Sequence, residues 1–188
     1  MMRIITGSAR SVKLLTLEGN EVTRPTTERV KEALFSMIQF DLEGRKVLDL
    51  FAGSGQLALE ALSRGAASAV LADIDRDACE IIKKNAQKTK LYEKTRVLNT
   101  DYKAVIRGFQ GREKFDIVFL DPPYAANLVE DALARLIRAD VLAEGAIVIC
   151  ESDKDIPFEA EGMYVKRFAR YSKSYLTILV KKGDESDE

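Results

Sequence analysis

A short apolar run that ends in two prolines constrains this chain most. Residues Phe115–Leu120 are almost wholly apolar and rich in β-forming types, which predicts a strand buried on both faces of a parallel sheet. The sequence continues as Asp121-Pro122-Pro123-Tyr124. Because proline has no backbone N–H, it cannot continue a hydrogen-bonded ladder. The strand therefore ends there, and the Asp121 carboxylate is held at the carboxyl edge of the sheet, where open α/β sheets bind ligands.

The groups at this strand end suit one kind of ligand. A fixed carboxylate, rigid backbone carbonyls and the ring of Tyr124 can together hold a planar base that carries an amino group. The chain contains no histidine, which excludes Ser-His-Asp triads, Cys-His nucleophiles and HExxH zinc sites. Any chemistry must use carboxylates, lysines, tyrosines, backbone groups or a cofactor.

Strand and helix patterns alternate through most of the chain. We predict strands over 46–50, 68–73, 96–100, 115–120, 146–150, 164–170 and 175–180, and helices over 28–39, 56–64, 75–89, near 104 and over 127–139. We expect Asp75 or Asp77 at the start of the third helix and Asn127 as the cap of the last. Repeated β-α units predict an α/β fold with a mostly parallel, doubly wound, seven-stranded sheet, and the last two strands predict an antiparallel hairpin at one edge.

The two ends of the chain differ from this pattern. Residues 1–24 predict a small β-hairpin extension, with strand candidates Arg3–Thr6 and Val12–Leu17 separated by Gly7-Ser8-Ala9. The α/β domain then occupies residues 25–182. Its first helix begins after Pro25, with a threonine as its N-cap. Residues 183–188 form an acidic tail that we expect to be disordered.

Composition indicates an ordinary globular protein. The 188 residues are 46% hydrophobic and 31% charged, which fits one soluble domain. No apolar run approaches the ~20 residues of a membrane span, and the first seventeen residues are too polar for a signal peptide. The two cysteines, Cys79 and Cys150, are far apart, so we expect buried thiols in the cytoplasm and no metal site.

Charge is nearly balanced overall, with a net value of −1, but basic residues gather near both ends. The first group is Arg3, Arg10, Lys13, Arg24, Arg29 and Lys31, and the second is Lys166, Arg167, Arg170, Lys173, Lys181 and Lys182. Such groups occur on ordinary solvated surfaces, and they are also what phosphate binding requires. Charge alone favours the first interpretation.

A glycine-rich loop follows the predicted strand at 46–50. Gly53 and Gly55 permit a tight turn and close approach of a ligand to the backbone. With Ala58, and with Asp73 twenty residues on, the spacing also satisfies the dinucleotide fingerprint, so NAD is a competing ligand. Asp49, immediately before the loop, would repel a pyrophosphate. It would instead attract the ammonium and sulfonium groups of S-adenosylmethionine.

Two further acids end predicted strands. Asp73 and Asp101 both lie at the carboxyl edge, where Asp73 could hold a ribose and Asp101 an adenine amino group. Each could equally be a helix N-cap or a loop acid. Together with Asp121 they place acids at three strand ends of one sheet edge, which favours the ligand interpretation.

The motifs together resemble a known family. DLFAGSG followed by DPPY resembles the Rossmann-like class I methyltransferases that use S-adenosylmethionine to methylate exocyclic amines. Including RIITG, RPTTERVKEALF and VLDLFAGSGQLALEALSRGA, the sequence resembles the RsmD-type bacterial 16S rRNA guanine-N2 methyltransferases over most of residues 3–124. Two positions depart from that pattern: Ser11-Val12 replaces a Gly-Arg pair, and Ala58 stands where glycine is frequent.

The resemblance implies roles for particular residues. The implied substrate is the N2 amine of a guanine in 16S rRNA, on the small ribosomal subunit or an assembly intermediate, and we expect a monomer. The implied catalytic residues are Asp121, Pro122, Pro123 and Tyr124. The implied cofactor-binding residues are Asp49, Phe51, Ala52, Gly53, Ser54, Gly55, Asp73, Ile74, Asp101 and Tyr102. Local charge and the resemblance together suggest RNA contacts by Arg3, Arg10, Lys13, Arg24, Thr26 and Arg29.

Two other functions remain open from the sequence. An enzyme of the same chemistry could methylate DNA adenine or a protein glutamine. The glutamine class more often has asparagine where this chain has Asp121, and 188 residues leave little room for DNA target recognition. A nucleotide-binding module without catalysis is the alternative from a different class, and it would leave the DPPY segment without a purpose.

Overall fold

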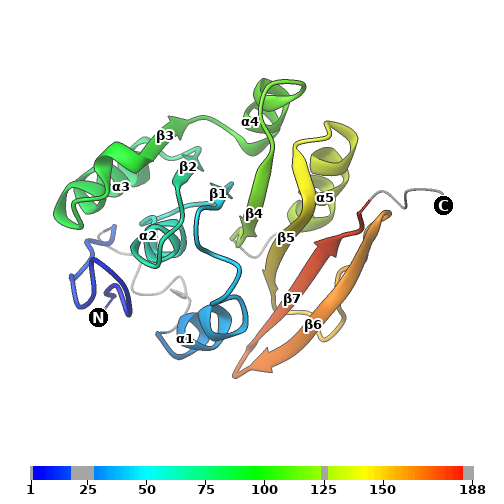
Figure 1. The fold of residues 1–188 in the computed structure, drawn as a ribbon, viewed down its shortest axis with the longest axis horizontal. Helices are drawn as coiled ribbons and strands as arrows, with labels where there is room; N and C mark the ends of the chain where they lie inside the picture. Colours follow the sequence, from blue (N-terminus) through cyan, green and yellow to red (C-terminus); the bar gives the residue numbers. More distant parts are fainter. Residues whose placement is uncertain (1, 18–27, 124–126, 184–188) are drawn as a thin grey trace.

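The sheet has the topology that the sequence predicts. The structure is a computed structural model that describes residues 2–17, 28–123 and 127–183 (Figure 1). Its seven-stranded sheet has the order β3-β2-β1-β4-β5-β7-β6. Strands β1 to β5 pair in parallel, whereas β7 is antiparallel to both β5 and β6. The strands are β1 (Lys46–Asp49), β2 (Ser68–Asp73), β3 (Thr95–Asn99), β4 (Phe115–Leu120), β5 (Leu142–Ser152), β6 (Met163–Tyr171) and β7 (Ser174–Lys181).

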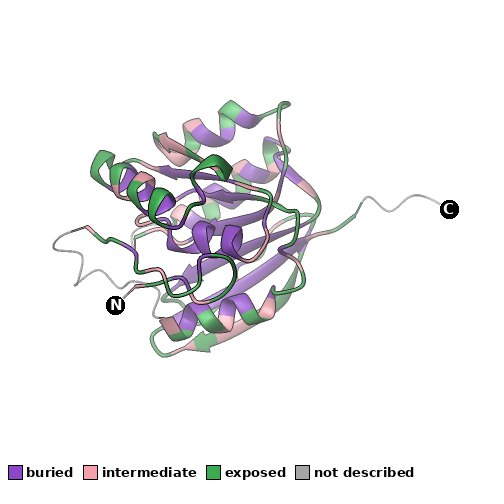
Figure 2. Ribbon diagram, turned by 60° about the vertical axis from the view of Figure 1, so that its left-hand side comes forward, coloured by how far each residue is buried: buried purple, intermediate pink, exposed green. Residues whose placement is uncertain are grey.

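Helices cover both faces of this sheet, as expected for a doubly wound fold (Figure 1). Side chains of α1, α2 and α3 share one apolar core with the sheet, and those of α4 and α5 share the other. Figure 2 shows buried residues concentrated in the strands and on the sheet-facing sides of the helices. The helices are α1 (Glu28–Met37), α2 (Gln56–Ser63), α3 (Arg76–Lys88), α4 (Tyr102–Phe109) and α5 (Leu128–Arg138), with a 3-10 turn η1 (Tyr92–Lys94).

The fold prediction is therefore confirmed, with local corrections. Strand β5 is longer than the predicted 146–150 and ends at Ser152. Asp75 caps α3 and its side chain accepts a hydrogen bond from the amide of Asp77. Asn127 occupies the N-cap position of α5 with a left-handed φ of 51°, but its side chain makes no capping hydrogen bond. The expected cap there is wrong because only the backbone carbonyl of Asn127 accepts, from the amide of Asp131.

The N-terminal segment, residues 2–17, packs on the face formed by α1, α2 and α3. Its two strand candidates meet at one antiparallel bridge, between Arg3 and Lys13, and do not form regular strands. Ile4 and Leu14 are nonetheless buried in the core on this side of the sheet. The extension is thus an irregular paired loop that is integrated into the domain.

Glu60 of α2 binds this segment through hydrogen bonds to its backbone. Its buried carboxylate accepts hydrogen bonds from the amides of Ile5 and Thr6 at 2.8 and 3.0 Å. It also pairs with Arg64 at 2.8 Å and with the buried Lys31 of α1 at 3.5 Å. The Lys31 ammonium in turn donates to the carbonyl of Arg3. Because a buried charge needs partners, this cluster fixes α1, α2 and the N-terminal segment together.

Ser63 and Gly7 complete the attachment. The Ser63 hydroxyl accepts from the amide of Ala9 and donates to the carbonyl of Thr6, and the Ser63 carbonyl accepts from the amide of Ser8. Gly7 has a φ of +91°, and a Cβ there would lie 1.8 Å from the Ser63 carbonyl oxygen. Only glycine fits this close approach.

Residues 18–27, 124–126 and 184–188 lie outside the described parts of the structure. The predicted N-cap of α1, the Tyr124 ring, the residues Arg24 and Thr26, and the predicted disorder of the acidic tail therefore stay predictions. Among the described helices, none is long and apolar enough to cross a membrane.

Candidate active site

The strand ends that carry the predicted site residues are neighbours. Asp49 at the end of β1 pairs in register with Leu71 of β2 and with Phe119 of β4. Asp73 ends β2, and Asp121 follows Leu120 at the end of β4. The winding direction of the sheet reverses between β1 and β4, and such a switch point is where open α/β sheets form ligand sites. The fold thus places Asp49, Asp73 and Asp121 at the carboxyl ends of three neighbouring strands.

The loop between β1 and α2 is a tight turn built on two glycines. Gly53 and Gly55 have φ values of +56° and +80°, which other L-residues adopt only at a cost. The amide of Ala52 donates to the carbonyl of Ala72 at 3.0 Å, and the amide of Gly53 donates to the Asp73 carboxylate at 2.8 Å. A Cβ on Gly53 would meet nothing within 4 Å, so its backbone is open to a ligand.

Asp49 is almost completely buried at the base of this loop, with 2% of its surface exposed. Burial, reinforced by the charge of Asp73, raises the pKa of the Asp49 carboxyl to about 7. Its carboxylate accepts a hydrogen bond from the amide of Phe51 at 3.4 Å. A desolvated carboxyl with such a pKa is typical of a functional site, because a cation brought beside it would stabilise the charged form.

Asp73 holds both the loop and its own strand end. One carboxylate oxygen accepts from Gly53, and the other accepts from the amide of Asp75 at 2.9 Å. A carboxylate has about four lone-pair sites, so these contacts are compatible with the predicted ribose contact. Ile74 follows with 76% of its surface exposed. An exposed apolar residue beside polar strand ends offers a surface for a flat ring.

Asp101 and Tyr102 have structural roles of their own. One Asp101 oxygen accepts from the amides of Lys103 and Ala104 and caps α4. The Tyr102 hydroxyl donates to Asp131 at 2.6 Å, and burial with this hydrogen bond raises the pKa of Tyr102 to about 12. The Tyr102 ring lies 5.2 Å from that of Phe51. The helix-cap interpretation of Asp101 is therefore realised, and its contact with an adenine amino group stays a prediction.

Asp121 and Pro122 are partly exposed and Pro123 is exposed at the end of the fully buried Val118-Phe119-Leu120. The chain thus leaves the core at Asp121, as expected from the two prolines. The predicted ring of Tyr124 lies outside the described residues.

The candidate RNA-contacting residues are at the surface where they are described. Arg10, Lys13 and Arg29 are exposed. Arg3 is also exposed, and its Nε and Nη2 both donate to one carboxylate oxygen of Glu28 at the start of α1, the Nε at 2.8 Å. This pair joins the N-terminal segment to α1, so Arg3 has a partner within the protein.

Two asparagines near the site were missed by reasoning from the sequence. Asn99 at the end of β3 donates to the carbonyls of Asp73 and Ile74. Asn85 is fully buried in α3 and contacts both Ser54 and Leu15. The available signal for Asn85 was a polar residue three positions after Ile82, on the apolar face of a helix.

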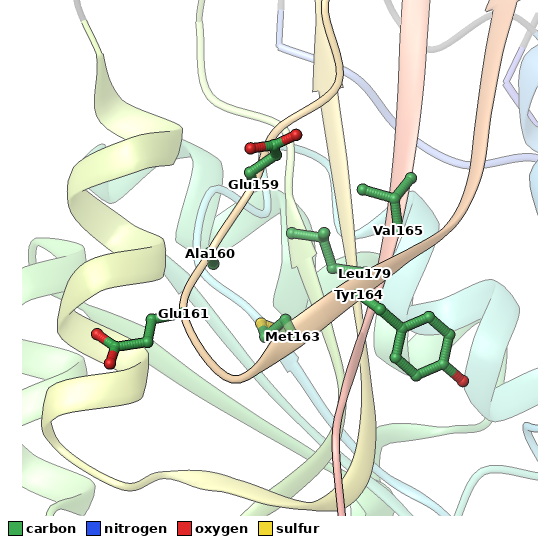
Figure 3. Close-up of a pocket in the computed structure, with 7 residues that line it drawn as sticks. All are labelled: Glu159, Ala160, Glu161, Met163, Tyr164, Val165 and Leu179. Carbon is green, nitrogen blue, oxygen red and sulfur yellow. The ribbon is translucent and has the colours of Figure 1, made fainter.

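One hollow bounded by described residues lies away from the strand-end acids. It has a volume of about 480 Å³ and lies beside β6, between the loop at 159–161 and the paired Val165 and Leu179 (Figure 3). This hollow is open to solvent and does not include any of the strand-end acids. It gives no support for a site at that position.

The donor set at the carboxyl edge fits S-adenosylmethionine. The buried Asp49 suits an ammonium or a sulfonium, Asp73 suits a ribose diol, and the exposed Ile74 suits an adenine face. The loop amide of Gly53 is already used by Asp73, so this turn is poorly prepared for a pyrophosphate. The competing NAD interpretation is correspondingly less favoured.

The chain is similar to known proteins over most of its length. The family described as "Conserved hypothetical protein 95" matches residues 2–180. The ribosomal RNA small subunit methyltransferase D of Haemophilus influenzae is 39% identical over 157 residues, which is 83% of this chain and 81% of that protein. A conserved hypothetical protein of Streptococcus pyogenes has a solved structure with 37% identity and a TM-score of 0.76, over 81% of this chain and 96% of that one.

A shorter match covers less of the chain. The release factor glutamine methyltransferase of Clostridium acetobutylicum is 34% identical over 123 residues, which is 64% of this chain and 40% of that protein. The longer matches span most of both partners, and the residues that the family model matches include the motifs that carry the resemblance. The chain therefore belongs to the conserved hypothetical protein 95 family, together with relatives named as RsmD-type rRNA methyltransferases.

Proposed function

We propose that this protein uses S-adenosylmethionine to methylate the exocyclic N2 amine of a guanine in 16S rRNA. The observation that carries the proposal is the adjacency of two strand ends. β1 ends at the buried Asp49, beneath the glycine loop, and its neighbour β4 ends at Leu120, directly before Asp121 and Pro122. One group suits a cationic cofactor and the other suits an amine.

Asp121 and Pro122 would orient the amine. An exocyclic guanine amine is a poor nucleophile because its lone pair is delocalised into the ring. Hydrogen bonds from its two N–H groups to the Asp121 carboxylate and the Pro122 carbonyl favour a more pyramidal nitrogen, whose lone pair then points at the methyl donor. Tyr124 would stack on the base and hold it in line. The nitrogen–methyl bond would form as the sulfonium–methyl bond breaks, S-adenosylhomocysteine would leave as a neutral thioether, and the nitrogen would release its extra proton to solvent. Because the methyl group is already activated, a chain without histidine is adequate for this reaction.

The base must leave its stack to reach this edge, or must already be unpaired. The exposed Arg10, Lys13 and Arg29 then suit phosphates on either side of the target nucleotide. We assign the same role to Arg3, Arg24 and Thr26. These contacts would position the RNA and leave the choice of base to the strand-end groups.

The release factor match favours one alternative substrate, the amide of a protein glutamine. That match covers less than half of the relative, and the chain carries Asp121 where the glutamine class more often has asparagine. A module that binds a nucleotide without catalysis would leave Asp121 dispensable.

An Asp121→Ala variant tests the catalytic assignment. Methyl transfer from labelled S-adenosylmethionine to small ribosomal subunits should fall by about 10² or more, and cofactor affinity by calorimetry should stay within about twofold of the wild type. Asp116→Ala is the matched control, since Asp116 is on the same strand and pairs with Arg45 at 3.5 Å, at the far end from the site. Equal methyl transfer by both variants would refute the assignment of Asp121.

A further inference from the structure

The cofactor loop is also held by a residue of α3 and by a residue of the N-terminal segment. Its central residue is Ser54, between the two glycines with positive φ. The Ser54 hydroxyl donates to the Met2 sulfur at 3.0 Å, and the Ser54 carbonyl accepts from the Asn85 side chain at 2.9 Å. Glycines leave a backbone free to adopt several conformations, so contacts at Ser54 decide which one the loop keeps.

Asn85 is the centre of this arrangement. It is fully buried in α3. Its amide nitrogen donates to the carbonyls of Ser54 and Leu15, and its oxygen accepts from the amide of Leu15 at 2.8 Å. The two bonds to Leu15 fix the orientation of the side-chain amide, because a flipped amide would set its NH₂ against the Leu15 N–H.

Holding the Ser54 carbonyl also fixes the next amide. The Ser54 carbonyl and the Gly55 N–H belong to one planar peptide group. That N–H donates to the carbonyl of Ala52 at 2.7 Å and closes the turn. Asn85 therefore acts on the shape of the loop and does not need to reach the ligand.

We propose that Asn85 is a positioning residue through which the N-terminal segment sets the affinity for S-adenosylmethionine. Leu15 orients Asn85, and Asn85 orients the Ser54–Gly55 peptide. The segment that carries Arg3, Arg10 and Lys13 is thereby coupled to cofactor binding. If RNA binds this segment, as in the proposed function, the coupling is reciprocal and bound RNA alters cofactor affinity.

Four single variants separate positioning from general stability. Asn85→Ala removes the link. Thr89→Ala is its control, because Thr89 is the buried C-cap of α3 and its hydroxyl donates only to the helix carbonyls of Asn85 and Ala86. Leu15→Pro removes the amide that orients Asn85, and Leu15→Ala keeps it. Leu15→Pro also provides the test if Asn85→Ala does not fold.

The readout is the Kd for S-adenosylmethionine by calorimetry, with thermal unfolding measured alongside. Asn85→Ala and Leu15→Pro should each raise the Kd about fivefold or more, and the two controls less than about twofold. The double variant Asn85→Ala/Leu15→Pro should resemble the weaker single variant, because both changes break the same link.

Three outcomes would overturn the inference: a Kd for Asn85→Ala equal to that for Thr89→Ala, equal values for the two Leu15 variants, or multiplicative effects in the double variant. These results require only that the wild type binds the cofactor. Failure of the wild type to bind S-adenosylmethionine would instead refute the proposed function. The rRNA target has no influence on either outcome.

Discussion

Asp49 and Asp73 end neighbouring strands, and the burial of Asp49, reinforced by the charge of Asp73, raises the pKa of the Asp49 carboxyl to about 7. The Asp73 carboxylate in turn holds the amide of Gly53. One carboxylate thus shapes the loop and the other is left desolvated beneath it. A charged Asp49 carboxylate is destabilised by this lack of solvation in the protein alone, and a cation bound beside it would stabilise the charged form.

The first prediction concerns Asp49→Asn. Since the folded pKa of about 7 lies above the ordinary value of 3.8, the folded state keeps a proton that the unfolded state has lost. The wild type therefore loses stability as pH rises from about 4 to 7, by roughly 4 kcal/mol in total. The variant lacks this loss, so urea unfolding should find it more stable than the wild type at pH 8 and nearly equal at pH 4. Its cofactor affinity should fall at least ~10-fold. If the free energy of unfolding depends on pH in the same way in both proteins, the pKa of Asp49 is not raised in the folded state.

A second prediction concerns the buried charge cluster at Glu60. Glu60→Gln leaves Lys31 and Arg64 without a full charge partner and sets an NH₂ group against donors, so we expect a loss of about 3–5 kcal/mol. Glu80→Gln is the control, because Glu80 pairs with Lys83 at the surface, where both are about half exposed. That change should cost less than ~1 kcal/mol. Similar urea midpoints for the two variants would show that the cluster does not hold the N-terminal segment.

A third prediction separates backbone strain from steric clash at two glycines. Gly7 and Gly44 both have positive φ, but a Cβ would clash with the Ser63 carbonyl only at Gly7. Gly44→Ala should therefore cost about 1 kcal/mol, from strain alone. Gly7→Ala should cost more and should release residues 2–17, seen as faster hydrogen exchange at the amides of Ser8 and Ala9. If hydrogen exchange at those two amides is as slow in Gly7→Ala as in the wild type, Gly7 does not pack closely against the Ser63 carbonyl.

The fourth prediction is a stabilising change at Ser11. Its φ of +67° lies in the left-handed region, which gives a physical reason for the glycine that is usual there in the resembling family. Ser11→Gly should raise the free energy of unfolding by about 1 kcal/mol. Ser8 is outside that region, so Ser8→Gly should not stabilise. If urea unfolding finds Ser11→Gly less stable than the wild type, the backbone assignment at Ser11 is wrong.

The ends of β4 and β1 were predictable because residues adjacent in the sequence determine them. Phe115–Leu120 and the prolines after it determine where β4 stops, and the glycines determine the turn after β1. The role of Asp101 could not be decided in advance, since an acid after a strand serves equally as a ligand and as the cap of α4. Only the paired strands place Asp49, Asp73 and Asp121 at one edge.

The N-terminal segment illustrates why the remaining part was not predictable. Residues 3–6 and 12–17 have strand-like composition, yet their amides are taken by distant side chains. Ile5 and Thr6 donate to Glu60, and Leu15 donates to Asn85. A backbone whose donors are used in this way cannot form a continuous ladder, and those partners are more than fifty residues away in the sequence.

The measurement that tests the account most directly is the identity of the methylated nucleoside. Small ribosomal subunits from a strain lacking the gene would be incubated with the protein and labelled S-adenosylmethionine, beside naked rRNA, duplex DNA and release factor protein. The account predicts labelled N2-methylguanosine in 16S rRNA, absent with Asp121→Ala. Label in DNA or protein only, or no label in any RNA despite measurable cofactor binding, would contradict it.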